Sequence, residues 1–130
     1  MLLDTSGLLA LHDRGEASHA AACESYRPAK LLVTHNYVLA EFVALTHARR
    51  LARAPTLEFL DDLLAHPRIE VVWVDQTLHN DAQKLLKVRL DKSYSLCDAV
   101  SFVLMRRSGI QDALTTDHHF EQEGFRRLLK

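Results

Sequence analysis

The sequence predicts an α/β fold in which a mainly parallel sheet is covered on both faces by helices. Short apolar runs, typical of strands buried on both sides, alternate along the chain with longer segments of helical periodicity. The chain has 130 residues, of which 48% are hydrophobic, so it can bury one sizeable core. No repeat, low-complexity tract or Gly/Ser-rich linker divides it. We therefore expect a single domain that spans residues 1–130.

The first two strands are short and apolar. Residues 1–4 form a buried strand that leads directly into a helical turn or two around Leu8. Residues 16–26 carry small residues on one helical face and end before Pro28, where a helix is expected to stop. Residues 30–34 (KLLVT) are the second strand.

The next two segments are amphipathic helices. Thr34 or Asn36 is expected to cap the first of them, which runs to about Arg53 and stops before Pro55. Residues 56–65 form the second, with leucines at helical spacing.

The second half of the chain continues the alternation. Residues 68–74 (RIEVVWV) are the strongest strand signal, and residues 77–88 are helical. Residues 95–107 are the most apolar helix. Residues 112–116 and 125–129 predict two more short strands, which completes the β-α-β order of a parallel sheet.

The composition argues against several classes of protein. The formal net charge is −1, so the broad basic field that drives non-specific nucleic-acid binding is absent. Cys23 and Cys97 match no metal or redox spacing and are expected to be reduced thiols. The amino terminus lacks the basic segment of a signal peptide, and no apolar run approaches the roughly 20 residues of a membrane span. We therefore expect a soluble, cytoplasmic protein without a membrane partner.

Four acids lie next to apolar residues, unlike the other acids of the chain. Asp4 and Asp117 directly follow predicted strands, at the sheet edge where open α/β folds build their sites. Glu41 lies beside the core-facing stripe of its helix, and Asp98 lies in the first turn of the most apolar helix. Buried carboxylates must be paired, hydrogen-bonded or metal-bound, and no Lys or Arg is placed to neutralise all four.

Each acid also has a purely structural explanation. Ser95 and Asp98 have the spacing of a capping box, and Asp117 is placed to cap a short following helix. Glu41 fits a helix-edge residue that reaches water. Only Asp4 has few structural uses. The adjacent His118 and His119 cannot both face one site from a helix, so we interpret them as exposed or loosely structural.

Four motifs in this order resemble the PIN-domain ribonucleases, and more narrowly the VapC-type toxins of toxin–antitoxin pairs. The resemblance covers the chain from residue 1 to Phe125, and the glycine before Phe125 also agrees with it. The motifs are Asp4-Thr5-Ser6, Ala40-Glu41-Phe42, Asp91-Lys92 ahead of Ser95-Leu96-Cys97-Asp98-Ala99, and Thr115-Thr116-Asp117-His118-His119-Phe120.

The resemblance implies a three-layer α/β/α sandwich with about five parallel strands and a metal-dependent endoribonuclease activity. It implies Asp4 and Asp98 as core ligands of Mg²⁺ or Mn²⁺, Asp117 as a further ligand, and Glu41 as the residue that holds a metal-bound water or orients the nucleophile. Hydroxyl groups of Thr5 and Ser95 are then expected to fix the carboxylates.

The resemblance also implies the partners: an RNA substrate, a small antitoxin that blocks the acidic pocket, and a homodimer built from apolar surface on the early helices. Lys92, close in sequence to Ser95 and Asp98, is the basic residue we select for a phosphate contact, against the alternative of a solvated surface charge. The competing hypothesis is a non-catalytic RNA-binding or regulatory domain on the same fold. Haloacid-type phosphatases are disfavoured because Ser6 stands where they need a second Asp, and no nucleotide-binding glycine motif occurs.

Overall fold

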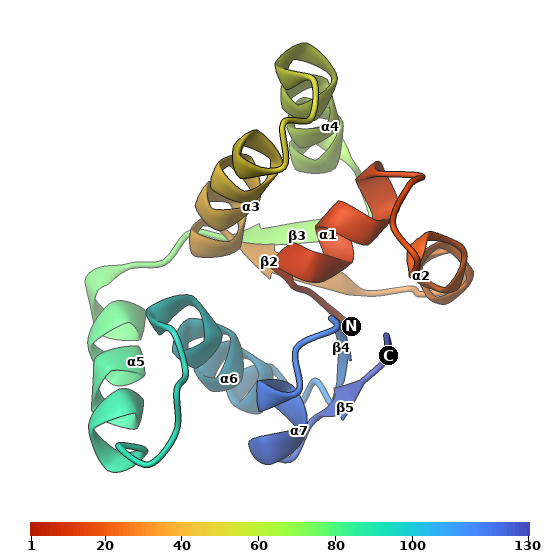
Figure 1. Cartoon of the computed structure of the whole chain (residues 1–130). Helices are drawn as coiled ribbons and strands as arrows, with labels where there is room; N and C mark the ends of the chain where they lie inside the picture. The colour runs from red at the N-terminus through yellow and green to blue at the C-terminus, as the bar shows by residue number, and fades with distance from the viewer.

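The computed structural model describes residues 1–130 and contains a five-stranded parallel sheet with helices on both faces (Figure 1). The strands are β1 (Leu2–Leu3), β2 (Leu32–His35), β3 (Ile69–Val72), β4 (Asp112–Leu114) and β5 (Arg126–Arg127). The helices are α1 (Thr5–His12), α2 (His19–Tyr26), α3 (Asn36–Ala48), α4 (Arg53–Ala65), α5 (Gln76–Val88), α6 (Leu96–Ser108) and α7 (His119–Gln122). This confirms the α/β class and the parallel sheet.

The strand order is β3-β2-β1-β4-β5, with β1 in the centre. Leu2 of β1 is in register with Val33 of β2 on one side and with Ala113 of β4 on the other. The chain therefore adds β2 and β3 on one side of β1, and then crosses back to add β4 and β5 on the other side. Such a reversal leaves a crevice at the carboxyl ends of the two central strands, where ligands of α/β proteins bind.

The central strands are buried on both faces, as the apolar runs predicted. Leu3 packs into a core with α1 to α4, whereas its neighbour Leu2 packs on the opposite face with α6 and α7. Figure 1 shows this division, with α1 to α4 toward the top of the view and α5 to α7 toward the bottom. The alternation follows from the two-residue period of a strand.

Gly7 allows α1 to approach the sheet closely. A Cβ atom at this position would lie 2.0 Å from the carbonyl oxygen of Leu114, which is backbone and cannot move aside. Only glycine therefore fits between α1 and β4, and this contact brings the residues that follow β1 close to the end of β4.

The helix that follows β2 is capped differently from the sequence prediction. Neither Thr34 nor Asn36 caps α3, because the hydroxyl of Thr34 donates to the Leu3 carbonyl and the amide oxygen of Asn36 accepts from the Val74 N–H. His35 caps it instead, since its Nδ1 accepts from the backbone N–H of Val38. Burial lowers the pKa of His35 to about 4, so the ring is neutral at pH 7 and this nitrogen can accept.

Other boundaries shift for simple reasons. Helix α3 ends at Ala48 rather than near Arg53, because Arg50 adopts a left-handed φ of 58° that terminates the helix. Pro55 does not separate two helices but lies in the first turn of α4, where a missing N–H costs nothing. The strongest predicted strand, β3, is an edge strand of the sheet, followed by Trp73 with 66% of its surface exposed. None of the seven helices has the length and apolar character that crossing a membrane requires.

Candidate active site

Three of the four predicted acids meet at the carboxyl ends of the central strands. Asp4 directly follows β1, Asp117 follows β4, and Asp98 lies in the first turn of α6. Asp4 and Asp98 are buried, Asp117 is half-buried and Glu41 is exposed. None of the four forms an ion pair with a Lys or Arg side chain; the ion pairs of these acids involve only histidines.

Asp4 is the most deeply buried of the four, with 4% of its surface exposed. The hydroxyl of Thr115 donates to its Oδ2 over 2.7 Å. Burial is the main cause that raises the pKa of Asp4 to about 7, and the negative charges of Asp98 and Glu41 raise it further. The carboxyl group is therefore partly protonated at neutral pH when no cation is bound.

Asp98 combines a structural bond with a place in the acidic cluster. Its backbone N–H donates to the Ser95 hydroxyl, and its Oδ2 accepts from the Ser95 N–H, each over 3.0 Å. This is the capping box that the spacing predicted, and it engages one carboxylate oxygen. Burial raises the pKa of Asp98, and the negative charge of Asp117 adds to the effect. Asp98 therefore forms the capping box and also lies in the acidic cluster.

Asp117 is held by the turn between β4 and α7. Its backbone N–H donates to the Thr115 hydroxyl over 3.0 Å, and its Oδ1 accepts from the His119 N–H over 2.9 Å. The capping hydrogen bond proposed for Asp117 thus exists, although His118 is the residue that directly precedes α7. Because Thr115 contacts both Asp4 and Asp117, one hydroxyl group fixes two acids.

Glu41 extends toward this cluster from α3. It is exposed, which agrees with a helix-edge residue in water rather than a buried acid. Its charge nevertheless acts on the cluster. Burial is the main cause that raises the pKa of the Cys97 thiol, and the negative charge of Glu41 is the second cause. The charge of Glu41 also contributes to the raised pKa of Asp4. Glu41 therefore lies at the solvent side of the same site.

The hydroxyl groups that hold the acids differ in part from those expected. The buried Thr5 hydroxyl donates to no carboxylate and has no hydrogen-bond partner in the protein. Thr115 takes this role, because the end of β4 lies beside the end of β1. The hydroxyl of Ser6 contacts Thr115 over 3.1 Å and accepts from the Thr116 N–H. Ser95 also holds Asp98, but its backbone N–H and not its hydroxyl group contacts the carboxylate, whereas the hydroxyl accepts from the Asp98 backbone N–H.

His119 also belongs to the site, against our interpretation of both histidines as loosely structural. Its Nδ1 lies 3.0 Å from Asp117 Oδ1 and 3.4 Å from Asp98 Oδ2. His118 has 64% of its side chain exposed. The signal for His119 and Thr115 was present in the TTDHHF motif, but sequence spacing does not show which of two adjacent residues turns inward. Lys92 is exposed beside Asp91 and next to Ser93, whose hydroxyl contacts His119.

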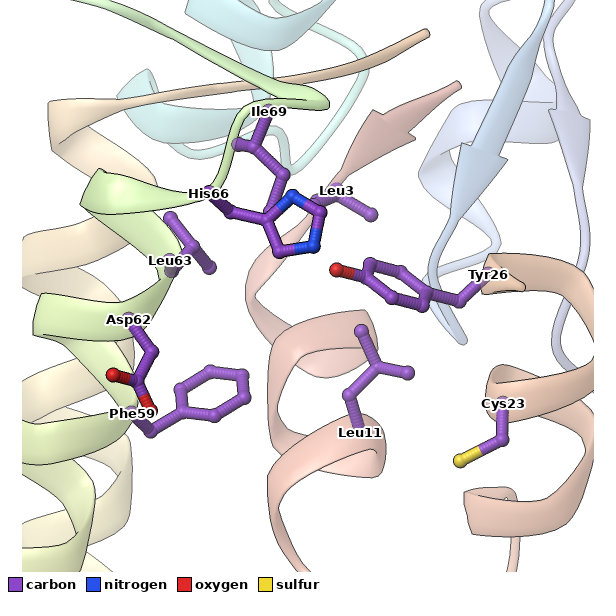
Figure 2. Close-up of a pocket in the computed structure, with 9 residues that line it drawn as sticks. All are labelled: Leu3, Leu11, Cys23, Tyr26, Phe59, Asp62, Leu63, His66 and Ile69. Carbon is purple, nitrogen blue, oxygen red and sulfur yellow. The ribbon is translucent and has the colours of Figure 1, made fainter. Parts of the chain in front are cut away.

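A separate apolar cavity of about 260 Å³ lies between α1, α2, α4 and β3 (Figure 2). Figure 2 shows Tyr26 and His66 facing each other across it. None of the four acids lines it, so it is distinct from the acidic cluster. Its lining residues are Leu3, Leu11, Cys23, Tyr26, Phe59, Asp62, Leu63, His66 and Ile69.

Comparison with known proteins identifies the family. The model of the PIN domain matches residues 1–125. The chain belongs to the PIN-domain family. It is 33% identical over 126 residues to the 23S rRNA-specific endonuclease VapC20 of Mycobacterium tuberculosis, in both strain CDC 1551 and strain H37Rv, with 96% of this chain and 95% of the relative covered.

The same relative supports the fold. The crystal structure of M. tuberculosis VapC20, described as a sarcin-ricin loop cleaving toxin, superimposes with a TM-score of 0.89 at 28% identity and covers 99% of this chain and 98% of that one. The likeness to the PIN-domain ribonucleases of the VapC type, and the three-layer α/β/α fold that it implied, are therefore confirmed.

Proposed function

We propose that this PIN-domain protein is a single-domain endoribonuclease that depends on Mg²⁺ or Mn²⁺ held by Asp4, Asp98 and Asp117. The observation that carries the proposal is the convergence of these three acids at the switch point of the sheet with no Lys or Arg to neutralise them. Such a group of carboxylates is unfavourable unless a cation or protons compensate it.

The residues present fit a hard divalent cation. Carboxylate oxygens are the ligands that Mg²⁺ and Mn²⁺ prefer, and Mg²⁺ keeps several waters of its own. The Thr5 hydroxyl, next to Asp4 in sequence, is buried without a hydrogen-bond partner in the protein, which is an unsatisfied polar group beside the proposed metal ligand. The raised pKa of Asp4 fits as well, because a cation takes the place of the proton that the metal-free cluster retains.

The chemistry divides between the cation and the side chains. A bound divalent cation relieves the charge on the phosphoryl oxygens and makes water more acidic. Glu41, whose charge acts on the cluster from its solvent side, would orient the attacking water and take its proton. The water oxygen then bonds to phosphorus, the bond from phosphorus to the leaving sugar oxygen breaks, and that oxygen takes up a proton from solvent water. Thr115 and Ser95 keep Asp4 and Asp98 in place during this step.

The substrate is a structured RNA with an exposed loop. VapC20, which this chain matches, is described as a 23S rRNA-specific endonuclease and as a sarcin-ricin loop cleaving toxin. The chain has a net charge of −1, so a local contact must replace a broad basic field. We infer that Lys92 makes this contact with a phosphate, because it lies beside Ser93 at the edge of the acidic cluster.

The likeness to VapC toxins implies protein partners as well. We propose a small antitoxin that covers the acidic cluster and a homodimer that uses apolar surface on the early helices. Leu57 and Leu64 support the dimer, since both are exposed and lie on one face of α4. Sedimentation of the purified chain tests it, and a monomer at every concentration would exclude it.

Cleavage of a labelled RNA hairpin tests the proposed function. Wild type is measured with Mg²⁺, with Mn²⁺ and with EDTA, beside Asp98→Asn and the exposed control Asp61→Asn. We expect cleavage only with metal, its loss in Asp98→Asn, and full activity in Asp61→Asn. The amide oxygen introduced by Asp98→Asn can still accept from the Ser95 N–H, so this variant should fold. Binding of RNA without cleavage by wild type would favour the non-catalytic alternative.

A further inference from the structure

His119, the first residue of α7, lies between two of the proposed metal ligands. Its Nδ1 is 3.0 Å from Asp117 Oδ1 and 3.4 Å from Asp98 Oδ2. The backbone N–H of the same residue donates to Asp117 Oδ1 over 2.9 Å. Only 16% of the side chain is exposed, so the imidazole is part of the wall of the site rather than a mobile surface group.

The other ring nitrogen fixes the orientation of the imidazole. Nε2 of His119 lies 3.0 Å from the Ser93 hydroxyl, and the ring packs edge-on against Tyr94 at 5.3 Å between centroids. A ring with its hydrogen on Nδ1 satisfies these contacts: Nδ1 donates to Asp117 Oδ2 over 3.3 Å and lies 3.4 Å from Asp98 Oδ2, and Nε2 accepts from Ser93. The ring therefore donates to Asp117 of the β4–α7 turn and lies within ion-pair distance of Asp98 of α6.

The segment that carries Ser93 is itself anchored. Glu123 has 2% of its side chain exposed, and it accepts from Arg89 Nε over 2.6 Å and from the guanidinium of Arg106. Arg89 lies between α5 and Ser93, whereas Arg106 lies on α6. Because the two arginines and the buried Glu123 between them tie the loop to α6 and α7, Ser93 meets His119 from a fixed direction.

We propose that His119 is a positioning residue that holds Asp98 and Asp117 at the separation at which they share a cation. The proposal rests on the proposed function, since it assumes that these acids bind the metal. Two carboxylates without a donor between them repel each other. Without the imidazole, only the His119 backbone N–H would hold the Asp117 carboxylate, which would then have freedom to rotate away from Asp98. A fixed N–H between them removes that freedom before the cation arrives, as outer residues do for many metal ligands.

Mn²⁺ binding to the protein without RNA tests the proposal by calorimetry. His119→Ala should weaken Mn²⁺ binding about 10- to 100-fold. His119→Asn should restore most of it, because the asparagine amide nitrogen lies close to the position of Nδ1 in histidine. His47→Ala, an exposed histidine of α3, is the control and should bind like wild type. At saturating Mn²⁺ the cleavage rate of His119→Ala should return to within a few-fold of wild type, since only the affinity for metal is lost.

The outcomes separate this inference from the function on which it depends. If wild type binds no Mn²⁺, the proposed metal site is wrong. If wild type binds and His119→Ala binds equally well, or His119→Asn is no better than His119→Ala, the positioning role is wrong. Coupling of a ¹⁴N nucleus to the bound Mn²⁺ in spin-echo EPR would also overturn it, because the imidazole would then be a ligand. Should His119→Ala fail to fold, Ser93→Ala tests the same chain of contacts and should weaken Mn²⁺ binding as well.

Discussion

Replacing Asp4 with asparagine should make the metal-free protein more stable at pH 8 while it abolishes metal-dependent cleavage. Asp4 is buried, and its pKa is raised to about 7 from an ordinary 3.8. Between these two pH values the folded chain holds a proton that the unfolded chain has released, so stability falls as the pH rises. Above pH 7 the full cost of the buried charge remains, and an uncharged amide avoids it.

The magnitude follows from the two pKa values. The difference between 3.8 and about 7 corresponds to about 4 kcal/mol at pH 8. The amide nitrogen of asparagine replaces one acceptor oxygen, which costs about 1 kcal/mol. The amide oxygen can still accept from Thr115, so a net gain of about 2–3 kcal/mol is expected.

Urea unfolding with EDTA at pH 5 and pH 8 measures the effect. At pH 5 the wild-type carboxyl group is protonated, so Asp4→Asn and wild type should differ little. At pH 8 the variant should unfold at a higher urea concentration than wild type. The free energy of unfolding of the exposed control Asp61→Asn should differ from that of wild type by no more than about 0.5 kcal/mol. If the variant is no more stable than wild type at pH 8, the argument that the buried negative charge of Asp4 destabilises the metal-free protein is wrong.

Two further substitutions test the framework of the site. Thr115→Val removes the donor to Asp4 and should lower cleavage about 10- to 100-fold at limiting Mn²⁺, whereas Thr115→Ser should keep most activity; equal loss in both would assign the effect to packing. Gly7→Ala forces a Cβ atom to within 2.0 Å of the Leu114 carbonyl oxygen and should lower the free energy of unfolding by about 1–3 kcal/mol in urea titrations. The control Gly15→Ala should be nearly neutral, because the nearest atom, 3.2 Å away, belongs to the side chain of Asp13, which can shift, and not to the backbone.

The candidate site could be predicted in composition but not in its supporting contacts. Asp4, Asp98 and Asp117 follow or begin elements that parallel topology brings to one edge, so their order along the chain was enough to group them. The hydrogen-bond partner of Asp4 could not be predicted from this order. Thr5 is adjacent in sequence but has no hydrogen-bond partner, whereas Thr115, 111 residues away, donates to it because β4 lies beside β1.

Local patterns alone determined the class of the fold, because the signals that distinguish helices from buried strands depend only on residues close in sequence. These signals are the helix and strand periods and the short apolar runs. They also determined the capping box of Ser95 and Asp98, whose two bonds span three residues. Tertiary structure decided the rest. It placed the most strand-like segment, β3, at the sheet edge, gave the cap of α3 to His35, and turned His119 rather than His118 toward the acids. These outcomes depend on which elements become neighbours, and packing between distant segments sets that choice.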